Sequence, residues 1–150
     1  MGRMKFMGTI LLLLVLVTGC DDSLDIRGDY DFSLTSWYLQ SGMRQDETVE
    51  IRLTLNREGN YREAGYRIGY IQLEGEGFVH DKNGKELINR EIQEISAIAG
   101  LDTTDIRHQV FTLYYRNEGS DNPEIRFVVV DNFNRERTLD IAWSLKSGNE

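Results

Sequence analysis

The side chains of this sequence that could do chemistry are one cysteine, two histidines and several short acidic turns. A nucleophile needs an activating base within hydrogen-bond reach, and zinc needs three or four His, Cys or carboxylate ligands. His80 and His108 stand apart from each other and from Cys20 in the sequence, and no serine lies in a Gly-x-Ser-x-Gly elbow. We therefore predict no enzyme activity, no catalytic residue, no metal site and no cofactor, with both histidines at the surface.

Three short acidic turns could attract calcium. They are Asp81-Lys82-Asn83-Gly84, Asp102-Thr103-Thr104-Asp105 and Asp131-Asn132-Phe133-Asn134. A twelve-residue calcium loop needs further ligands and a closing Glu, which these turns do not supply. Asp and Asn side chains also close turns by hydrogen-bonding to their own backbone. We expect this second, structural role for all of them.

The amino terminus has the pattern of a secretory signal. Arg3 and Lys5 precede an apolar stretch over 6–17, which ends in Val17-Thr18-Gly19-Cys20. A membrane-spanning helix needs about 20 apolar residues, so this stretch is too short for a permanent span. Small residues before a cysteine resemble the bacterial lipobox. We predict a lipoprotein signal peptide over 1–19 and lipidation of Cys20, which would attach the protein to a membrane.

Composition limits the partners and the means of stabilisation. The formal net charge is −8, and loss of Arg3 and Lys5 with the signal peptide makes it −10. An acidic protein repels phosphate backbones, so we predict no nucleic-acid partner. Cys20 is the only cysteine, which leaves none for a disulfide. The polar segment 20–29 is expected to be a membrane tether, and 30–147 a single domain stabilised by packing.

Apolar and polar residues alternate along much of this domain, which predicts strands. The clearest alternation covers 49–55, and shorter or less regular examples lie at 30–34, 66–70, 78–79, 110–115, 125–130 and 139–145. Seven or so short strands at this spacing, separated by turn residues, favour an antiparallel β-sandwich of immunoglobulin-like type. The fold class predicted is therefore mainly β.

The period changes over about 86–99. Ile88, Ile92, Ile95 and Ala99 recur at helical spacing, and Gly100 follows where a helix is expected to end. We predict one amphipathic helix here, inserted before the last three strands. Its apolar stripe is expected to cover an edge or an open end of a sheet, and the alternative is a docking surface for a partner.

Aromatic residues are numerous for a domain of this size, and they include Trp37, Tyr61, Tyr66, Tyr70, Tyr114, Tyr115 and Trp143. Most fall on predicted strands and are expected in the core or in cross-strand pairs. A minority could instead form an exposed face for a protein partner.

Several segments together carry a family resemblance, namely Cys-Asp-Asp-Ser-Leu-Asp-Ile at 20–26, Glu-Thr-Val-Glu-Ile-Arg at 47–52, Arg-Glu-Gly-Asn-Tyr at 57–61, Tyr-Arg-Ile-Gly-Tyr-Ile-Gln at 66–72, Phe-Thr-Leu-Tyr-Tyr at 111–115 and Val-Asp-Asn-Phe at 130–133. In order and spacing they resemble the TraQ-type conjugative-transposon lipoproteins of Bacteroides and relatives, which carry a domain of unknown function. The chain departs from that pattern over 86–105, which is longer, and at Asn134, where relatives tend to have glycine.

The resemblance implies a non-enzymatic accessory or interaction protein of the conjugative mating apparatus. Its expected partners are the membrane, through lipidated Cys20, and other proteins of the cell envelope. The expected location is a bacterial membrane, facing the periplasm or exposed on the surface. A cell-envelope ligand-binding module, adhesin or inhibitor with no role in conjugation is the alternative.

Overall fold

The computed structural model describes residues 30–59 and 61–147. The predicted signal peptide at 1–19, the tether at 20–29 and Cys20 lie outside these residues. The described chain is mainly β, and its strands are β1 (Phe32–Trp37), β2 (Gly42–Met43), β3 (Thr48–Arg57), β4 (Tyr66–Glu74), β5 (Gly77–Asp81), β6 (Ile92–Glu94), β7 (His108–Asn117), β8 (Glu124–Asp131), β9 (Glu136–Ala142) and β10 (Ser144–Leu145).

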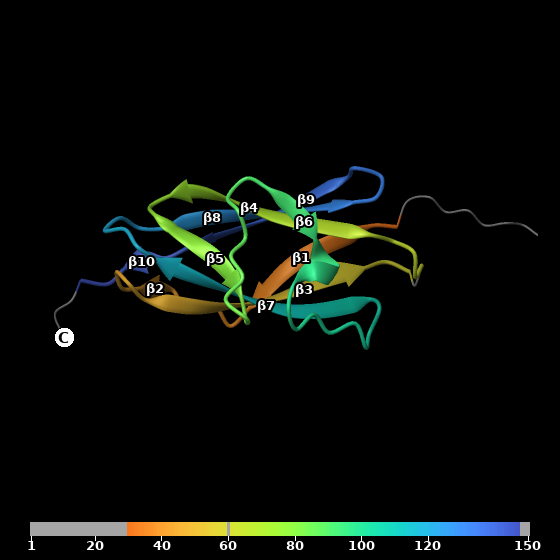
Figure 1. Ribbon diagram of the computed structural model, residues 1–150, viewed down its shortest axis with the longest axis horizontal. Coiled ribbons are helices and arrows are strands. Elements are labelled where there is room, and N and C mark those ends of the chain that lie inside the picture. Colours follow the sequence, from red (N-terminus) through yellow and green to blue (C-terminus); the bar gives the residue numbers. More distant parts are fainter. Residues whose placement is uncertain (1–29, 60, 148–150) are drawn as a thin grey trace, which may run out of the picture.

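The strands form two four-stranded antiparallel sheets that lie one over the other (Figure 1). The first sheet has the order β1-β3-β7-β5, and the second has the order β6-β4-β8-β9. The short strands β2 and β10 pair in parallel as a separate two-stranded ribbon. The predicted β class with antiparallel sheets is confirmed.

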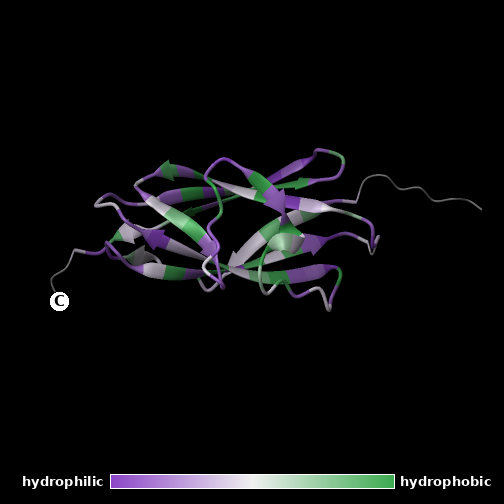
Figure 2. Ribbon diagram, in the orientation of Figure 1, coloured by the Kyte–Doolittle hydropathy of each residue, from purple (hydrophilic) through white to green (hydrophobic). Residues whose placement is uncertain are grey.

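The core lies between the two sheets because one side chain in two along each long strand points inward. Figure 2 shows hydrophobic and hydrophilic residues alternating along the strands. In β3, Val49, Ile51, Leu53 and Leu55 are buried, while the residues between them are half-buried or exposed. Both sheets contribute to a single buried cluster. This alternation is the pattern from which the strands were predicted.

One aromatic residue of the core contacts both layers. Tyr115 of β7 is fully buried, and its ring stacks on that of Trp143 at a centroid distance of 5.0 Å. Its hydroxyl accepts a hydrogen bond from the Gln72 amide of β4 at 2.9 Å. Burial raises the pKa of Tyr115 to about 12, so the hydroxyl stays neutral across the physiological range.

The helix predicted over 86–99 is wrong. In this stretch the structure has the strand β6 and the single 3₁₀ turn η2 (Ile95–Ala97). Arg90 has a φ of 69°, which no right-handed helix contains. The isoleucines do not share a face either, because Ile92 is 46% exposed while Ile95 is 4% exposed.

Hydrogen bonds to distant strands explain why this segment is extended. The Leu87 N–H donates to the Val79 carbonyl of β5, and the Arg90 N–H donates to the Tyr70 carbonyl of β4. Close approach to β4 requires Gly69, because a Cβ there would overlap the Glu91 carbonyl oxygen. β-Branched isoleucine also favours strands over helices. The segment therefore extends the second sheet as its edge strand β6, and it is no helix laid over that edge.

The observed conformation predicts different losses of stability for two isoleucines that would have shared one face of the expected helix. Ile95→Ala should lower the free energy of unfolding by about 2–4 kcal/mol because it leaves a cavity in the core. Ile92→Ala should change it by less than about 0.5 kcal/mol because that side chain is exposed. Urea unfolding of both variants measures the difference, and equal losses would contradict the observed burial.

Candidate functional site

The two histidines lie apart and have structural partners. His80 of β5 pairs with Tyr114 of β7, whereas His108 begins β7. Six residues of strand separate them, about 20 Å. His108 Nδ1 lies 2.9 Å from an Asp105 carboxylate oxygen, and His80 Nδ1 lies 2.8 Å from the Asp81 carbonyl oxygen. Among the described residues, no three His, Cys, Asp or Glu side chains are placed to hold a metal ion.

The turns that begin at Asp81 and Asp131 share a hydrogen-bond pattern, in which the carboxylate accepts the backbone N–H groups two and four positions on. The Asp81 carboxylate accepts the backbone N–H groups of Asn83, Lys85 and Ala99. The Asp131 carboxylate accepts those of Phe133 and Arg135, together with the Arg135 guanidinium. Each aspartate is also bonded through its own backbone to the residue four positions on. In the third turn, the Asp102 carboxylate likewise accepts the backbone N–H of Thr104, two positions on.

These bonds settle the role of the two buried aspartates. Burial alone would raise the pKa of the Asp81 and Asp131 carboxyls, but the N–H donors outweigh it and hold each pKa below 3.8. Both carboxylate oxygens of each residue face donors, so they close turns as the sequence predicted. Gly84 and Asn134 occupy matching positions at positive φ, 79° and 60°. Asparagine tolerates this left-handed conformation better than most residues with a side chain, which suits Asn134 to the turn.

The outer surface of the first sheet carries a row of side chains that we call the aromatic face. Its members come from four strands and the residue after β1, and they are Trp37, Tyr38, Arg52, Phe78, His80 and Tyr114. Strand register brings them together, since Trp37 pairs with Arg52 and His80 pairs with Tyr114. All alternate with inward-pointing residues on their strands except Tyr38, which follows the end of β1.

Contacts within the aromatic face hold its side chains in place. The Arg52 guanidinium lies 4.9 Å from the centre of the Trp37 ring and forms an ion pair with Glu50. Hydrogen bonding to Glu50 raises the pKa of Arg52 further above its ordinary value. The rings of His80 and Tyr114 stack at 5.3 Å with an angle of 14° between them. Side chains that already contact one another lose less entropy when a partner binds.

Tyr38 is the most exposed member, at 87%, although its ring contacts Trp37 at 5.3 Å. Its φ of 57° is a left-handed conformation that costs a tyrosine about 1–2 kcal/mol. Strain of this kind clusters at binding sites, where the surrounding structure maintains it. Trp, Tyr and Arg are also the residues enriched in binding hot spots. The aromatic face is therefore the candidate partner-binding surface.

Sequence reasoning found part of this surface. Trp37 and Tyr114 belonged to the set of aromatics from which an exposed minority was expected, whereas Tyr115 and Trp143 of that set lie in the core. Tyr38, Arg52, Phe78 and His80 were missed as members. The alternation in β3 already assigned Arg52 to the outer side, but only cross-strand register places it, Phe78 and His80 beside the aromatics.

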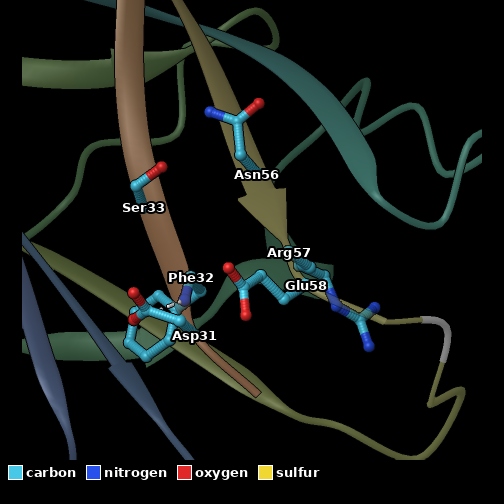
Figure 3. Close-up of a pocket in the computed structure, with 6 residues that line it drawn as sticks. All are labelled: Asp31, Phe32, Ser33, Asn56, Arg57 and Glu58. Carbon is cyan, nitrogen blue, oxygen red and sulfur yellow. Dashed lines mark hydrogen bonds between the residues drawn. The ribbon is translucent and has the colours of Figure 1, made fainter.

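A polar pocket of about 260 Å³ lies where the described chain begins, lined by Asp31, Phe32, Ser33, Asn56, Arg57 and Glu58 (Figure 3). The Arg57 guanidinium points away from Asp31, donates to the Tyr61 carbonyl and lies 5.1 Å from the Tyr66 ring centre. Asp31 is bound by Arg137 at 2.6 Å. Because these two charged groups already have structural partners, the pocket is a weaker candidate than the aromatic face.

Comparison with known proteins identifies the family. A model described as TraQ conjugal transfer protein matches residues 3–146. The chain belongs to the TraQ conjugal transfer protein family. The family resemblance predicted from the sequence is thus confirmed, and membership supports a role in conjugation. A search of curated proteins finds no significant match.

Three solved structures similar to this TraQ-family chain come from Bacteroides species. A conjugative transposon lipoprotein from Bacteroides eggerthii is 27% identical with a TM-score of 0.63, over 77% of this chain and 98% of that one. A conjugate transposon protein from Bacteroides vulgatus is 25% identical with a TM-score of 0.62, and the match covers 86% of this chain and 96% of that one. A lipoprotein from Bacteroides thetaiotaomicron shares the fold. It is 23% identical with a TM-score of 0.61, and the match covers 85% of this chain and 89% of that one.

Within residues 30–59 and 61–147, no helix is long and apolar enough to cross a membrane.

The Asp131 turn yields a testable prediction about stability. Asp131→Ala removes the acceptor of three N–H groups and should lower the free energy of unfolding by about 2–4 kcal/mol at pH 7. The folded pKa lies below 3.8, so this contribution is full above about pH 5 and is lost as the pH falls below the ordinary value. Urea unfolding of wild type and variant between pH 3 and 7 measures it.

Asp140→Ala is the control, because Asp140 forms a solvent-exposed pair with Arg126 and should contribute much less to the free energy of unfolding than Asp131. Calcium should leave the melting temperature of the wild type unchanged. A calcium-dependent rise that Asp131→Ala abolishes would mean that this turn binds the ion.

Proposed function

We propose that this protein is a lipid-anchored, non-enzymatic accessory protein of the conjugative mating apparatus. The observation that carries the proposal is the family match over 3–146, which includes the predicted lipobox cysteine. The similar structure from Bacteroides eggerthii is described as a conjugative transposon lipoprotein. An accessory role agrees with a site made of recognition residues.

The proposed anchor is Cys20, after removal of the signal peptide 1–19. A diacylglycerol on its sulfur and an acyl chain on the new amine would hold the protein stably, because each buried methylene contributes about 0.8 kcal/mol. The domain 30–147 would then stand beside the membrane on the tether 20–29. The protein would face the periplasm or the cell exterior.

The proposed partner surface is the aromatic face. Arg52, Trp37 and Tyr38 form a compact centre of the kind that dominates protein interfaces. Tyr114 and His80 extend it across the sheet as a flat stacked pair. A flat, preorganised surface of this kind suits a folded envelope protein of the mating apparatus, since a small ligand would need a concave pocket.

We also propose that the sandwich is immunoglobulin-like. In that fold the strand orders are A-B-E-D in one sheet and C-F-G in the other. The orders β1-β3-β7-β5 and β4-β8-β9 support this equivalence. β6 is then an additional edge strand beside β4, formed by the segment predicted as a helix.

A cell-envelope ligand-binding module is the second candidate function. A groove of about 370 Å³ on the second sheet favours it, with Gly69, Ile71, Ile92 and Val128 among its lining residues. Its apolar walls could hold a small molecule. In that case the protein would be dispensable for conjugation.

The lead proposal predicts two linked phenotypes for one substitution. Cys20→Ser should move the protein from the membrane fraction to the soluble fraction, because the thioether that carries the lipid cannot form. It should also lower transfer frequency toward that of a deletion strain. Fractionation and mating assays on the same donor strains measure both effects.

Ser23→Ala, three residues away, is the matched control and should leave both measurements unchanged. A deletion strain that transfers at the wild-type frequency would contradict a role in conjugation and favour the ligand-binding alternative. Membrane retention of the Cys20→Ser variant would contradict the anchor alone.

A further inference from the structure

The described chain begins at one end of the sandwich, which we call the Tyr30 end and define by the segments 30–32, 57–59, 61–67 and 131–137. Figure 1 shows the start of β1, the loop after β3 and the β8–β9 turn together at this end. Contacts join them, because Arg135 donates to the Tyr30 carbonyl and Arg67 donates to Asn134 at 3.1 Å. The Tyr30 end is therefore one connected surface.

The length of the tether keeps this end near the proposed anchor. An extended chain spans at most about 3.6 Å per residue, so Tyr30 lies within about 35 Å of Cys20. The β4 strand of nine residues, about 30 Å long, runs from the Tyr30 end to the opposite end of the sandwich. The Tyr30 end is thus the part of the domain with the easiest access to the lipid surface.

Two exposed aromatic side chains lie at this end. Phe133 is 54% exposed in the β8–β9 turn, and Tyr61 is 46% exposed in the loop between β3 and β4. The turn around Phe133 is held rigidly by the Asp131 carboxylate. Exposed aromatic rings match the level of lipid headgroups, where such rings concentrate in membrane proteins.

Charge distinguishes the two ends of the sandwich. The segments of the Tyr30 end contain five arginines and five carboxylates. The loop 102–107 lies at the same end, because the Arg57 N–H donates to the Arg107 carbonyl, and its two aspartates and one arginine bring the net charge to −1. At the opposite end, segments 44–47, 74–77, 117–124 and 144–146 carry seven carboxylates, one arginine and one lysine, for a net charge of −5. These segments adjoin one another, because the Glu118 N–H donates to the Glu76 carbonyl, the Asp46 N–H to the Asn117 carbonyl and the Leu145 N–H to the Asn122 side chain. A membrane rich in anionic lipid repels this acidic end more than the Tyr30 end.

We propose that the Tyr30 end rests on the lipid surface, with Tyr61 and Phe133 at the level of the headgroups and the acidic end directed away. This inference depends on the proposed lipid anchor. The long axis of the sandwich would then stand away from the membrane. The aromatic face, on the side of the first sheet, would remain open to a protein partner.

Single-site fluorescence on the full lipidated protein tests this orientation. Lipid occupies the sulfur of Cys20, so a new cysteine is the one reactive thiol. Asn132→Cys, beside Phe133, and Ser120→Cys, at the acidic end, would each carry an environment-sensitive dye. The protein would be reconstituted into vesicles of phosphatidylethanolamine and phosphatidylglycerol that contain a headgroup-attached quencher.

We expect the dye at position 132 to be quenched about threefold more strongly than the dye at position 120. Tyr61→Ser with Phe133→Ser should reduce this difference, whereas Ile88→Ser, an exposed apolar residue outside the segments of the Tyr30 end, should not. Equal quenching at both positions in protein that floats with the vesicles would overturn the orientation and leave the anchor intact.

Two further outcomes would also overturn the inference. Failure of the protein to float with the vesicles would remove the anchor and the orientation together. Shielding at position 132 that grows with protein density at constant lipid would mean that a second copy of the chain covers the Tyr30 end.

Discussion

The stack of Tyr115 on Trp143 is buried in the core and joins β7 of the first sheet to the residue that follows β9 of the second. Tyr115 is fully buried in β7, and its hydroxyl accepts a hydrogen bond from Gln72 in the opposite sheet. Gly77 makes room for it, because a Cβ there would overlap the Tyr115 ring. An inward Tyr115 requires its neighbour Tyr114 to point outward, where it stacks on His80. The core and the aromatic face are therefore set by one strand register.

Local pattern was sufficient for the long strands, because a half-buried strand reveals its two sides through alternation. It failed over 86–99, where the isoleucine spacing suited a helix but the Tyr70 and Val79 carbonyls offered hydrogen bonds from distant strands. It also missed β2 and merged β9 and β10 into one strand over 139–145, since a parallel pair of two residues each leaves no periodic signal. Sequence reasoning could not weigh the local preference for a helix against hydrogen bonds offered by strands that are distant in the sequence.

The candidate functional residues also include some that local sequence predicts and some that it does not. The Asp81 and Asp131 turns were predictable, because an Asx side chain bonds to backbone only a few residues away. The aromatic face was not, because Trp37, Arg52 and Tyr114 come from three strands that only cross-strand register brings together. Cys20 lies outside the described residues and its lipidation stays a prediction from the amino-terminal pattern. The proposed function thus rests on a predicted lipidation signal at the amino terminus and on a candidate binding surface built by the fold.

The central claim is that a membrane-anchored sandwich serves conjugation by presenting the aromatic face to another envelope protein. Photocrosslinking in mating-competent donor cells tests it most directly, with p-benzoylphenylalanine placed at position 38 and, as a control, at position 88. We predict that position 38 crosslinks to a product of the conjugation genes and that position 88 does not. Equal crosslinking from both positions, or none to a conjugation protein from position 38, would contradict the account.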